Sequence, residues 1–447
     1  MPIFDSYIEQ HSERFIGELL TYVRIPSISQ TGEGIDAAID FLNLSFGRIG
    51  ARTQVLQTSG HPIVLAEVGP ANAAFTLLVY GHYDVVPAQA QPGWRTDPFQ
   101  PVVDGDRIWG RGTGDNKSQH LARIFGVELY QRVIGDLPIK IKFLIEGEEE
   151  IGSKGFTAYV KQNPGPFKSD LCCYSDAPMF PNDQPVLFLG VRGMLQLEFK
   201  ARGAARDLHS GLFGGIAPSP VLDLCALLAK LADADGRLRL PGIDQDGRLS
   251  AADSEALQRL PLDYDGIVET MGVPPITGRD AYAYYRNLLC RHNFNISGIS
   301  GGYAGEGARN AIPHEATAKA DVRIAGGGDI DAIYGAVQSL VEREGQGRVS
   351  VAKLSGEPPS KTPVDHPYVA IIARAVANGF GREPLLVPSM GATTPDYVFT
   401  KVLGMPSILV PYAPYDENNH VANESTKVSL YLKSIKTSAH IIRELAR

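Results

Sequence analysis

The chain has 447 residues, more than a single hydrophobic core usually serves, so its length predicts two domains. Hydrophobic residues make up 44% of the chain and charged residues 21%, which is ordinary globular usage and excludes a disordered or fibrous chain. The net charge of -8, without clustered Lys or Arg, argues against a nucleic-acid partner. A small-molecule partner is therefore expected.

The first 26 residues have the pattern of an amphipathic helix with scattered acidic residues. They lack the charged and then apolar profile of a signal peptide, so we expect a cytoplasmic protein without a membrane partner. The adjacent Cys172 and Cys173 lie in an apolar run. That position indicates reduced core residues and not a disulfide framework.

Short, continuous apolar runs alternate with helical patterns along much of the chain. Such runs are typical of strands buried on both faces of a parallel sheet. The sequence therefore predicts an α/β fold with a doubly wound, mainly parallel sheet. The expected strands are residues 75–80, 139–145, 171–174 and 406–410, and the expected helices are residues 117–132 and 369–378.

The character of the chain changes after Gly190. Residues 191–203, 295–299 and 316–324 show the in-out alternation of half-exposed antiparallel strands, and α/β features resume near Thr362. We therefore expect a catalytic domain formed by residues 1–190 and 360–447. Residues 191–359 would form an inserted α+β domain with an antiparallel sheet.

Acidic and histidine residues follow the predicted strands, where an open α/β sheet places its ligand site. His82 and Asp84 are two residues apart, so their side chains share one side of an extended segment and Asp84 can orient the imidazole. Asp115 follows a glycine-rich turn at the predicted start of a helix. The residues leave alternatives open: a solvated His82 and Asp84, and a helix N-cap at Asp115.

Four acidic residues crowd the end of the strand at residues 139–145, and one further acid and one histidine occur later: Glu146, Glu148, Glu149, Glu150, Asp176 and His420. Crowded carboxylates repel each other unless cations neutralise them, although a solvated loop would also hold them. Imidazole and carboxylate ligands without cysteine suit zinc. The set therefore predicts a dinuclear zinc site with ions roughly 3.5–4 Å apart.

The motifs GHYDVVP, GRGTGDNKS, EGEEEIGS, SDAP, DLHSG, GARNAIP and ENNHVANE resemble those of the carnosinase, aminoacylase and carboxypeptidase-G group of dinuclear zinc metallopeptidases. The resemblance spans nearly the whole chain and is greatest for the dipeptidase and carnosinase branch. It implies that His82 and Asp176 hold one zinc ion, that Glu150 and His420 hold the other, and that Asp115 bridges them.

The resemblance also implies a catalytic role for Glu149, and we expect Asp84 to take part in catalysis by orienting His82. Glu149 would be the general base that takes a proton from the attacking water and delivers it to the leaving amine. In the run EGEEEIGS the two acids before IGS match the family, which favours Glu149 and Glu150 over Glu148. Manganese or cobalt can replace zinc, because oxygen and imidazole ligands discriminate weakly among these ions.

The inserted domain resembles the family's lid and dimerisation domain, which implies a homodimer. His209 matches a histidine that reaches from the partner subunit to the scissile carbonyl, and Arg323, Asn310 and the loop containing Thr393 match substrate-binding positions. Without the resemblance, His209 is a loop histidine and Arg323 a strand-edge surface arginine. Asn310 and the GATTP loop depart from the dipeptidase pattern, which leaves the substrate's side chains open.

The leading expectation is a dipeptidase or related exopeptidase that closes its lid over a small peptide. The alternative within the same chemistry is a deacylase that removes an acetyl or succinyl group from an amino acid. Two further alternatives are a catalytically silent binding protein that keeps the fold, and an acid cluster without any metal. The presence of Glu149 and of all five ligand positions favours the enzyme.

Overall fold

The computed structural model describes residues 3–447 apart from 89–91, 245, 248, 273–275 and 277. The chain splits into two compact units. Unit 1 comprises Met1–Leu189, Thr362–Pro388 and Thr394–Arg447, and unit 2 comprises Gly190–Lys361 and Ser389–Thr393. Sequence reasoning assigned Gly190, residues 360–361 and residues 389–393 to the catalytic domain, but these residues group with unit 2.

In the described part of unit 1, an eight-stranded sheet has the order β1-β2-β6-β3-β7-β16-β8-β15. The pairs β3–β6, β3–β7, β7–β16 and β8–β15 are parallel, and the remaining pairs are antiparallel. The mainly parallel sheet expected from the apolar runs is confirmed. The strands are β1 (Arg52–Leu56), β2 (Ile63–Val68), β3 (Thr76–His82), β6 (Lys140–Glu146), β7 (Leu171–Tyr174), β8 (Val186–Phe188), β15 (Leu385–Val387) and β16 (Ser407–Leu409).

Helices cover both faces of this sheet. They are α1 (Asp5–Val23), α2 (Ile35–Arg48), α3 (Lys117–Val133), α4 (Lys154–Gln162), α11 (Pro367–Phe380) and α12 (Val428–Leu445), with short turns η1 (Glu149–Ile151), η2 (Gly165–Phe167), η3 (Pro181–Asp183) and η4 (Val398–Val402). Leu77 and Val79 of β3 pack into the large core that α1, α2, α3, α11 and α12 share. Tyr80 points to the other face, where its ring meets Phe156 of α4 and Phe399 of η4.

A three-stranded sheet of order β17-β5-β4 joins distant parts of unit 1. It consists of β4 (Val102–Asp104), β5 (Arg107–Trp109) and β17 (Ser425–Lys427), all antiparallel. Ser425 pairs with Trp109 in this sheet. The pairing brings the segment after His420 beside the segment before Asp115.

In unit 2, the described residues form a four-stranded antiparallel sheet of order β11-β13-β9-β14 and a two-stranded ribbon β10-β12. The strands are β9 (Gly193–Arg202), β10 (Leu208–His209), β11 (Asn293–Gly301), β12 (Ala311–Ile312), β13 (Glu315–Ile324) and β14 (Val349–Glu357). The helices are α5 (Ser210–Phe213), α6 (Pro220–Leu231), α7 (Ala251–Gln258), α8 (Tyr264–Met271), α9 (Ala281–Leu289) and α10 (Ile330–Glu344).

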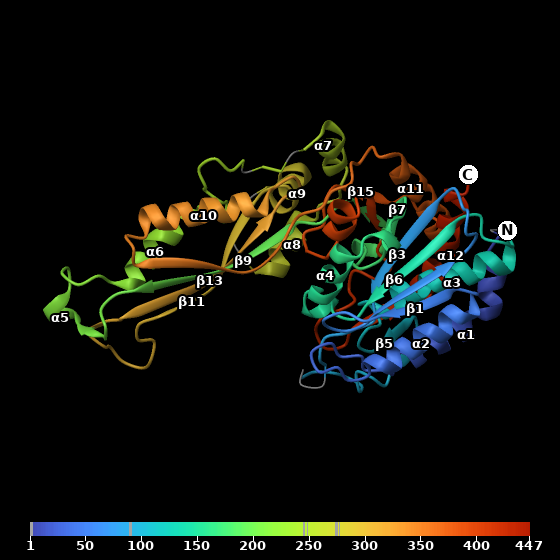
Figure 1. Ribbon diagram of the computed structural model, residues 1–447, viewed down its shortest axis with the longest axis horizontal. Helices are drawn as coiled ribbons and strands as arrows, with labels where there is room; N and C mark the ends of the chain where they lie inside the picture. The colour runs from blue at the N-terminus through green and yellow to red at the C-terminus, as the bar shows by residue number, and fades with distance from the viewer. Residues whose placement is uncertain (1–2, 89–91, 245, 248, 273–275, 277) are drawn as a thin grey trace. The chain divides into compact units, whose positions relative to one another are not determined.

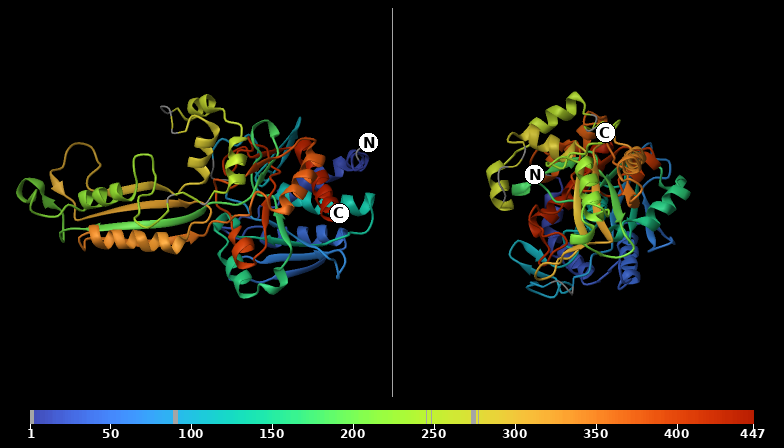
Figure 2. Two further views of the ribbon diagram at one scale, coloured as in Figure 1. Left: turned by 90° about the horizontal axis from the view of Figure 1, so that it is seen from above. Right: turned by 90° about the vertical axis from the view of Figure 1, so that its left-hand side faces the viewer.

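The sheet of unit 2 has one covered face. Buried and less buried residues alternate along β9 and β13, so each strand gives every second side chain to the core. Helices α6 and α10 pack on that face, and α10 runs along the length of the strands (Figure 1 and Figure 2). The antiparallel inserted fold expected from the alternation is confirmed.

Two further expectations concern the N-terminus and the cysteines. The N-terminal amphipathic pattern forms α1, while Met1 and Pro2 lie outside the described residues. Cys172 and Cys173 are buried in β7 with free thiols. Across the described ranges, we find no helix with both the length and the apolar character needed to cross a membrane.

Candidate metal centre

The acidic and histidine residues singled out in the sequence meet at one edge of the large sheet. The strands β3, β6 and β7 are parallel neighbours, so their carboxyl ends meet at that edge. His82 ends β3, and Asp115 lies just before α3. The remaining members are Glu149 and Glu150 on η1 after β6, Asp176 after β7, and His420 between β16 and β17.

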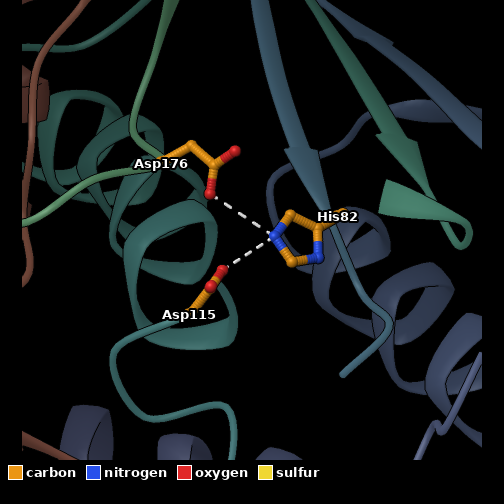
Figure 3. Close-up of side chains that lie close together, drawn as sticks. All are labelled: His82, Asp115 and Asp176. Atoms are coloured by element: carbon orange, nitrogen blue, oxygen red, sulfur yellow. Dashed lines mark hydrogen bonds and ion pairs between the residues drawn. The ribbon is translucent and has the colours of Figure 1, made fainter. Parts of the chain in front are cut away.

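His82 is the centre of the first cluster. Its Nε2 lies 2.9 Å from Oδ1 of Asp115 and 3.4 Å from Oδ1 of Asp176 (Figure 3). The His82 side chain is fully buried, and both carboxylates point at the same ring nitrogen. These three groups present one nitrogen and two oxygens to a common point.

His420 is the centre of the second cluster. Its Nε2 lies 2.8 Å from Oε2 of Glu150 and 3.2 Å from Oδ2 of Asp115. The backbone of His420 has a φ of 61°, a left-handed value that non-glycine residues seldom adopt and that functional sites often hold. Asp115 therefore belongs to both clusters, with one carboxylate oxygen in each.

The crowding of charge shifts the pKa values of the whole set. Burial and the neighbouring Asp115 raise the pKa of Glu150 to about 7, and burial together with Asp176 raises that of Glu149 well above its usual range. Hydrogen bonds to Asp115 and Glu150 raise the pKa of His420 to about 11. Burial opposes protonation of His82, but the nearby carboxylates outweigh it and raise its pKa well above the ordinary value.

The donor set fits two divalent cations. Within each cluster the possible ligand atoms all lie within 4.8 Å of one another. Oε1 of Glu150 is buried and has no hydrogen-bond partner among the described residues, which is costly unless something else neutralises it. Imidazole nitrogens and carboxylate oxygens are ligands for zinc and related ions.

Asp84 connects the histidine of the first cluster to the turn that carries Glu149 and Glu150. Its Oδ1 lies 3.3 Å from Nδ1 of His82, the ring nitrogen that faces away from the cluster. The same carboxylate accepts the backbone N–H of Glu149 at 3.3 Å and that of Glu150 at 3.2 Å. One buried aspartate thus fixes the ring orientation of His82 and the position of the turn.

Two alternatives without a metal site, which the sequence left open, are wrong. Asp115 does not cap α3, because the N-cap position belongs to Asn116 and the carboxylate of Asp115 contacts the two histidines. The four glutamates do not form a solvated loop either. Glu146 and Glu148 are buried, and Glu146 accepts hydrogen bonds from Tyr80 at 2.8 Å and Ser153 at 2.9 Å.

Sequence reasoning missed Glu424, which organises the loop before Asp115. Its fully buried carboxylate accepts the backbone N–H of Gly112, Gly114 and Asp115, and it pairs with the guanidinium of Arg111 at 2.6 Å. Glu424 is only four residues after His420, so one loop carries both His420 and the carboxylate that holds the segment before Asp115. The only signal in the sequence was an acid just after a predicted ligand, which many solvated loops share.

The other residues from the sequence prediction belong to unit 2. His209 is exposed on β10, its Nδ1 accepts the N–H of Gly211 at 3.0 Å, and the carbonyl oxygen of Asn310 accepts the N–H of Ser210 at 3.1 Å. Arg323 donates to Oγ1 of Thr393 at 3.1 Å.

The strand-edge alternative for Arg323 is wrong. Arg323 lies on β13, and β13 is an inner strand of the sheet, flanked by β11 and β9.

Comparison with known proteins agrees with the geometry. Residues 78–444 match the model of peptidase family M20/M25/M40. The Cys-Gly metallodipeptidase dug1 of Schizosaccharomyces pombe is 29% identical, over 98% of this chain and 97% of its own length. The Beta-Ala-His dipeptidase of Homo sapiens is 28% identical, over 99% of this chain and 92% of its own length.

Solved structures show the same fold. The M20 family metallo-carboxypeptidase Sso-CP2 from Sulfolobus solfataricus superposes with a TM-score of 0.88 at 29% identity, covering 97% of this chain and 99% of its own. Human carnosine dipeptidase 1 gives a TM-score of 0.78 at 27% identity, covering 100% of this chain and 99% of its own. The chain therefore belongs to peptidase family M20/M25/M40 and is a metallopeptidase, a hydrolase that acts on peptide bonds.

Proposed function

We propose that this metallopeptidase is a dipeptidase with two divalent cations in its active site. The observation that carries the proposal is the position of Asp115, which offers one carboxylate oxygen to each of two histidine-centred clusters. Two of the relatives that span nearly the whole chain are named dipeptidases, which favours peptide over acyl substrates.

We propose zinc for both positions, with manganese or cobalt able to replace it. His82 and Asp176 would hold one ion, Glu150 and His420 the other, and Asp115 both. Bound there, the ions supply Lewis acidity that polarises a carbonyl group and makes water more acidic.

Glu149 is the proposed general base. Its carboxylate takes a proton from the attacking water and then gives that proton to the nitrogen of the leaving amine. Burial and neighbouring acids raise the pKa of Glu149, and a raised pKa favours the protonated carboxyl group that delivers the proton to the leaving amine. Asp84 supports this role, because it accepts the backbone N–H of Glu149.

The proposal also assigns roles to four residues of unit 2. His209 would donate a hydrogen bond to the developing oxyanion, an interaction that commonly contributes roughly 3–4 kcal/mol. Arg323, beside Thr393, would bind the free carboxylate of the dipeptide through its planar guanidinium. Asn310 would contact the peptide backbone, and closure of unit 2 as a lid would exclude water.

A homodimer belongs to the same proposal, and the exposed surface that β11 and α6 form among the described residues supports it. The strand β11 is an exposed edge of its sheet, and edge strands invite pairing with another chain. A hollow of about 700 Å³ lies between α6 and β11, lined in part by Ile296 and Ile299, which are 40% and 53% exposed. Apolar exposure of this kind marks an interaction surface.

The substrate class is tested by hydrolysis of a mixed panel of dipeptides and N-acyl amino acids after zinc loading. Released amine is the readout. We expect cleavage of the free dipeptides and none of the acylated amino acids. Turnover confined to the acylated compounds would place the chain among deacylases and overturn the dipeptidase proposal. Cell fractionation tests the cytoplasmic location that we propose with it.

The roles of Glu149 and His209 are tested together by subunit complementation. Glu149→Gln and His209→Ala should each bind metal and be inactive alone. If His209 acts on the partner's site, mixed dimers contain one complete site, and an equal mixture regains roughly a quarter of wild-type activity. A mixture that stays inactive, although mixed dimers form, would show that His209 does not act across a dimer.

A further inference from the structure

Three buried polar side chains form a hydrogen-bonded chain behind Asp176. Asn116 donates from Nδ2 to Oδ1 of Asp176 at 2.9 Å and to the carbonyl oxygen of Ser175 at 2.6 Å. Oδ1 of Asn116 lies 3.1 Å from Nδ1 of His120, and Nε2 of His120 lies 3.1 Å from the hydroxyl of Tyr22. Tyr22, His120 and Asn116 are fully buried.

The direction of each hydrogen bond follows from its neighbour. The two oxygens around Nδ2 of Asn116 require that atom to donate, so Oδ1 must accept. His120 therefore carries its proton on Nδ1 and donates to Asn116, which leaves Nε2 as an acceptor for the Tyr22 hydroxyl. Every hydrogen of the chain thus points toward Asp176, and hydrogen bonds aligned in this way strengthen one another.

Packing fixes the chain of bonds at both ends. The ring of Tyr22 stacks on Phe41 at a centroid distance of 4.3 Å, and Nζ of Lys117 lies 5.0 Å from its centre. Near the other end, a Cβ on Gly81 would lie 2.8 Å from Cβ of His120 and 3.1 Å from Oδ1 of Asn116. Only glycine at this position of β3 lets α3 approach so closely.

We propose that Tyr22, His120 and Asn116 are positioning residues that hold Asp176 as a ligand and so control how tightly the cation beside His82 is retained. The inference rests on the proposed two-metal site. The chain of bonds removes one rotational freedom of the Asp176 carboxylate, because Asn116 occupies one lone pair of Oδ1 and leaves the other directions open to a cation. Partners of metal ligands orient them in this manner.

The first test is Tyr22→Phe, which removes a single hydroxyl and keeps the aromatic ring in its stack. Tyr431→Phe is the matched control, because Tyr431 is also buried in unit 1 and its hydroxyl has no hydrogen-bond partner among the described residues. Both variants are loaded with Co²⁺, and loss of metal to a chelator is followed through the visible spectrum. We expect roughly tenfold faster loss of one of the two ions from Tyr22→Phe, and wild-type behaviour from Tyr431→Phe.

The second test compares His120→Gln with His120→Leu. A glutamine amide can still donate toward Asn116 and accept from Tyr22, whereas leucine can do neither. We expect His120→Gln to retain metal better than His120→Leu. Equal retention in this pair, or a Tyr22→Phe protein that matches Tyr431→Phe, would overturn the positioning role. A wild-type protein that binds no cation at all would instead refute the proposed metal site.

Discussion

The buried ion pair between Arg111 and Glu424 gives the sharpest stability prediction. Oε2 of Glu424 accepts from Arg111, and Oε1 accepts the N–H of Gly114 at 2.8 Å and that of Asp115 at 3.0 Å. In Glu424→Gln, either orientation of the amide places its NH2 group against another donor. Removing one partner of a buried pair leaves an uncompensated charge, so we expect a loss of about 3–5 kcal/mol of unfolding free energy.

The assay is urea unfolding of the metal-free protein, with Asp416→Asn as the control. Asp416 pairs with Arg107 in the same part of unit 1, but its side chain is 60% exposed, so its loss should cost less than about 1 kcal/mol. The double variant Arg111→Met with Glu424→Gln removes both charges. It should cost less than the two single changes together.

The two results together decide whether Glu424 organises the loop. A cost below about 1 kcal/mol for Glu424→Gln, similar to Asp416→Asn, would refute the reasoning from burial. If the loss of unfolding free energy in the double variant equals the sum of the two single losses, Arg111 and Glu424 do not stabilise each other. The metal content of Glu424→Gln should fall as well, because Asp115 loses the acceptor of its backbone N–H.

Three further predictions follow from the charges of the site. Neighbouring carboxylates raise the pKa of His82 and of His420, so a cation that binds there must displace the protons of the two imidazole rings. The apparent affinity for zinc should therefore rise with pH between 6 and 9, and calorimetry in two buffers should detect the released protons. Burial raises the pKa of Glu146 to about 8 from 4.5, so its contribution to stability is full below pH 4.5 and is lost as pH rises to about 8. Glu146→Gln should therefore gain a few kcal/mol relative to wild type, measured without metal, on going from pH 5 to pH 8. Arg323→Met should raise KM for dipeptides much more than it lowers kcat, and it should abolish the preference for free dipeptides over dipeptide amides. An unchanged preference would show that Arg323 does not bind the carboxylate of the substrate.

The central strands of unit 1 were predictable because burial on both faces leaves a continuous apolar run. The expected strand at residues 139–145 is β6 at Lys140–Glu146, and the one at 171–174 is β7. The edge strand β1 has the sequence RTQVL and is mostly exposed, and β15 has only three residues, so neither produces such a run. Both were absent from the prediction for that reason.

The proximity of the acids and histidines was predictable from a different regularity, namely that these residues follow strands that end at one edge of the sheet. That rule is enough to predict from the sequence that His82 and Asp176 lie close together. It says nothing of Asn116 or Tyr22, because their partners are 60 and 98 residues away in the chain. A contact of that kind leaves no periodic pattern in the sequence.

The position of His420 shows why the site depends on the folded chain and not on any local motif. His420 is more than 300 residues from Asp115, yet their side chains lie 3.2 Å apart. Two features bring them together: β17 pairs with β5, and Glu424 accepts the N–H groups of the loop before α3. Because the same carboxylate also neutralises Arg111, the loop that carries Asp115 is ordered by bonds that need no cation. The folded chain therefore holds the acidic side chains together against their mutual repulsion, and a cation that binds there would reduce the repulsion between these carboxylates.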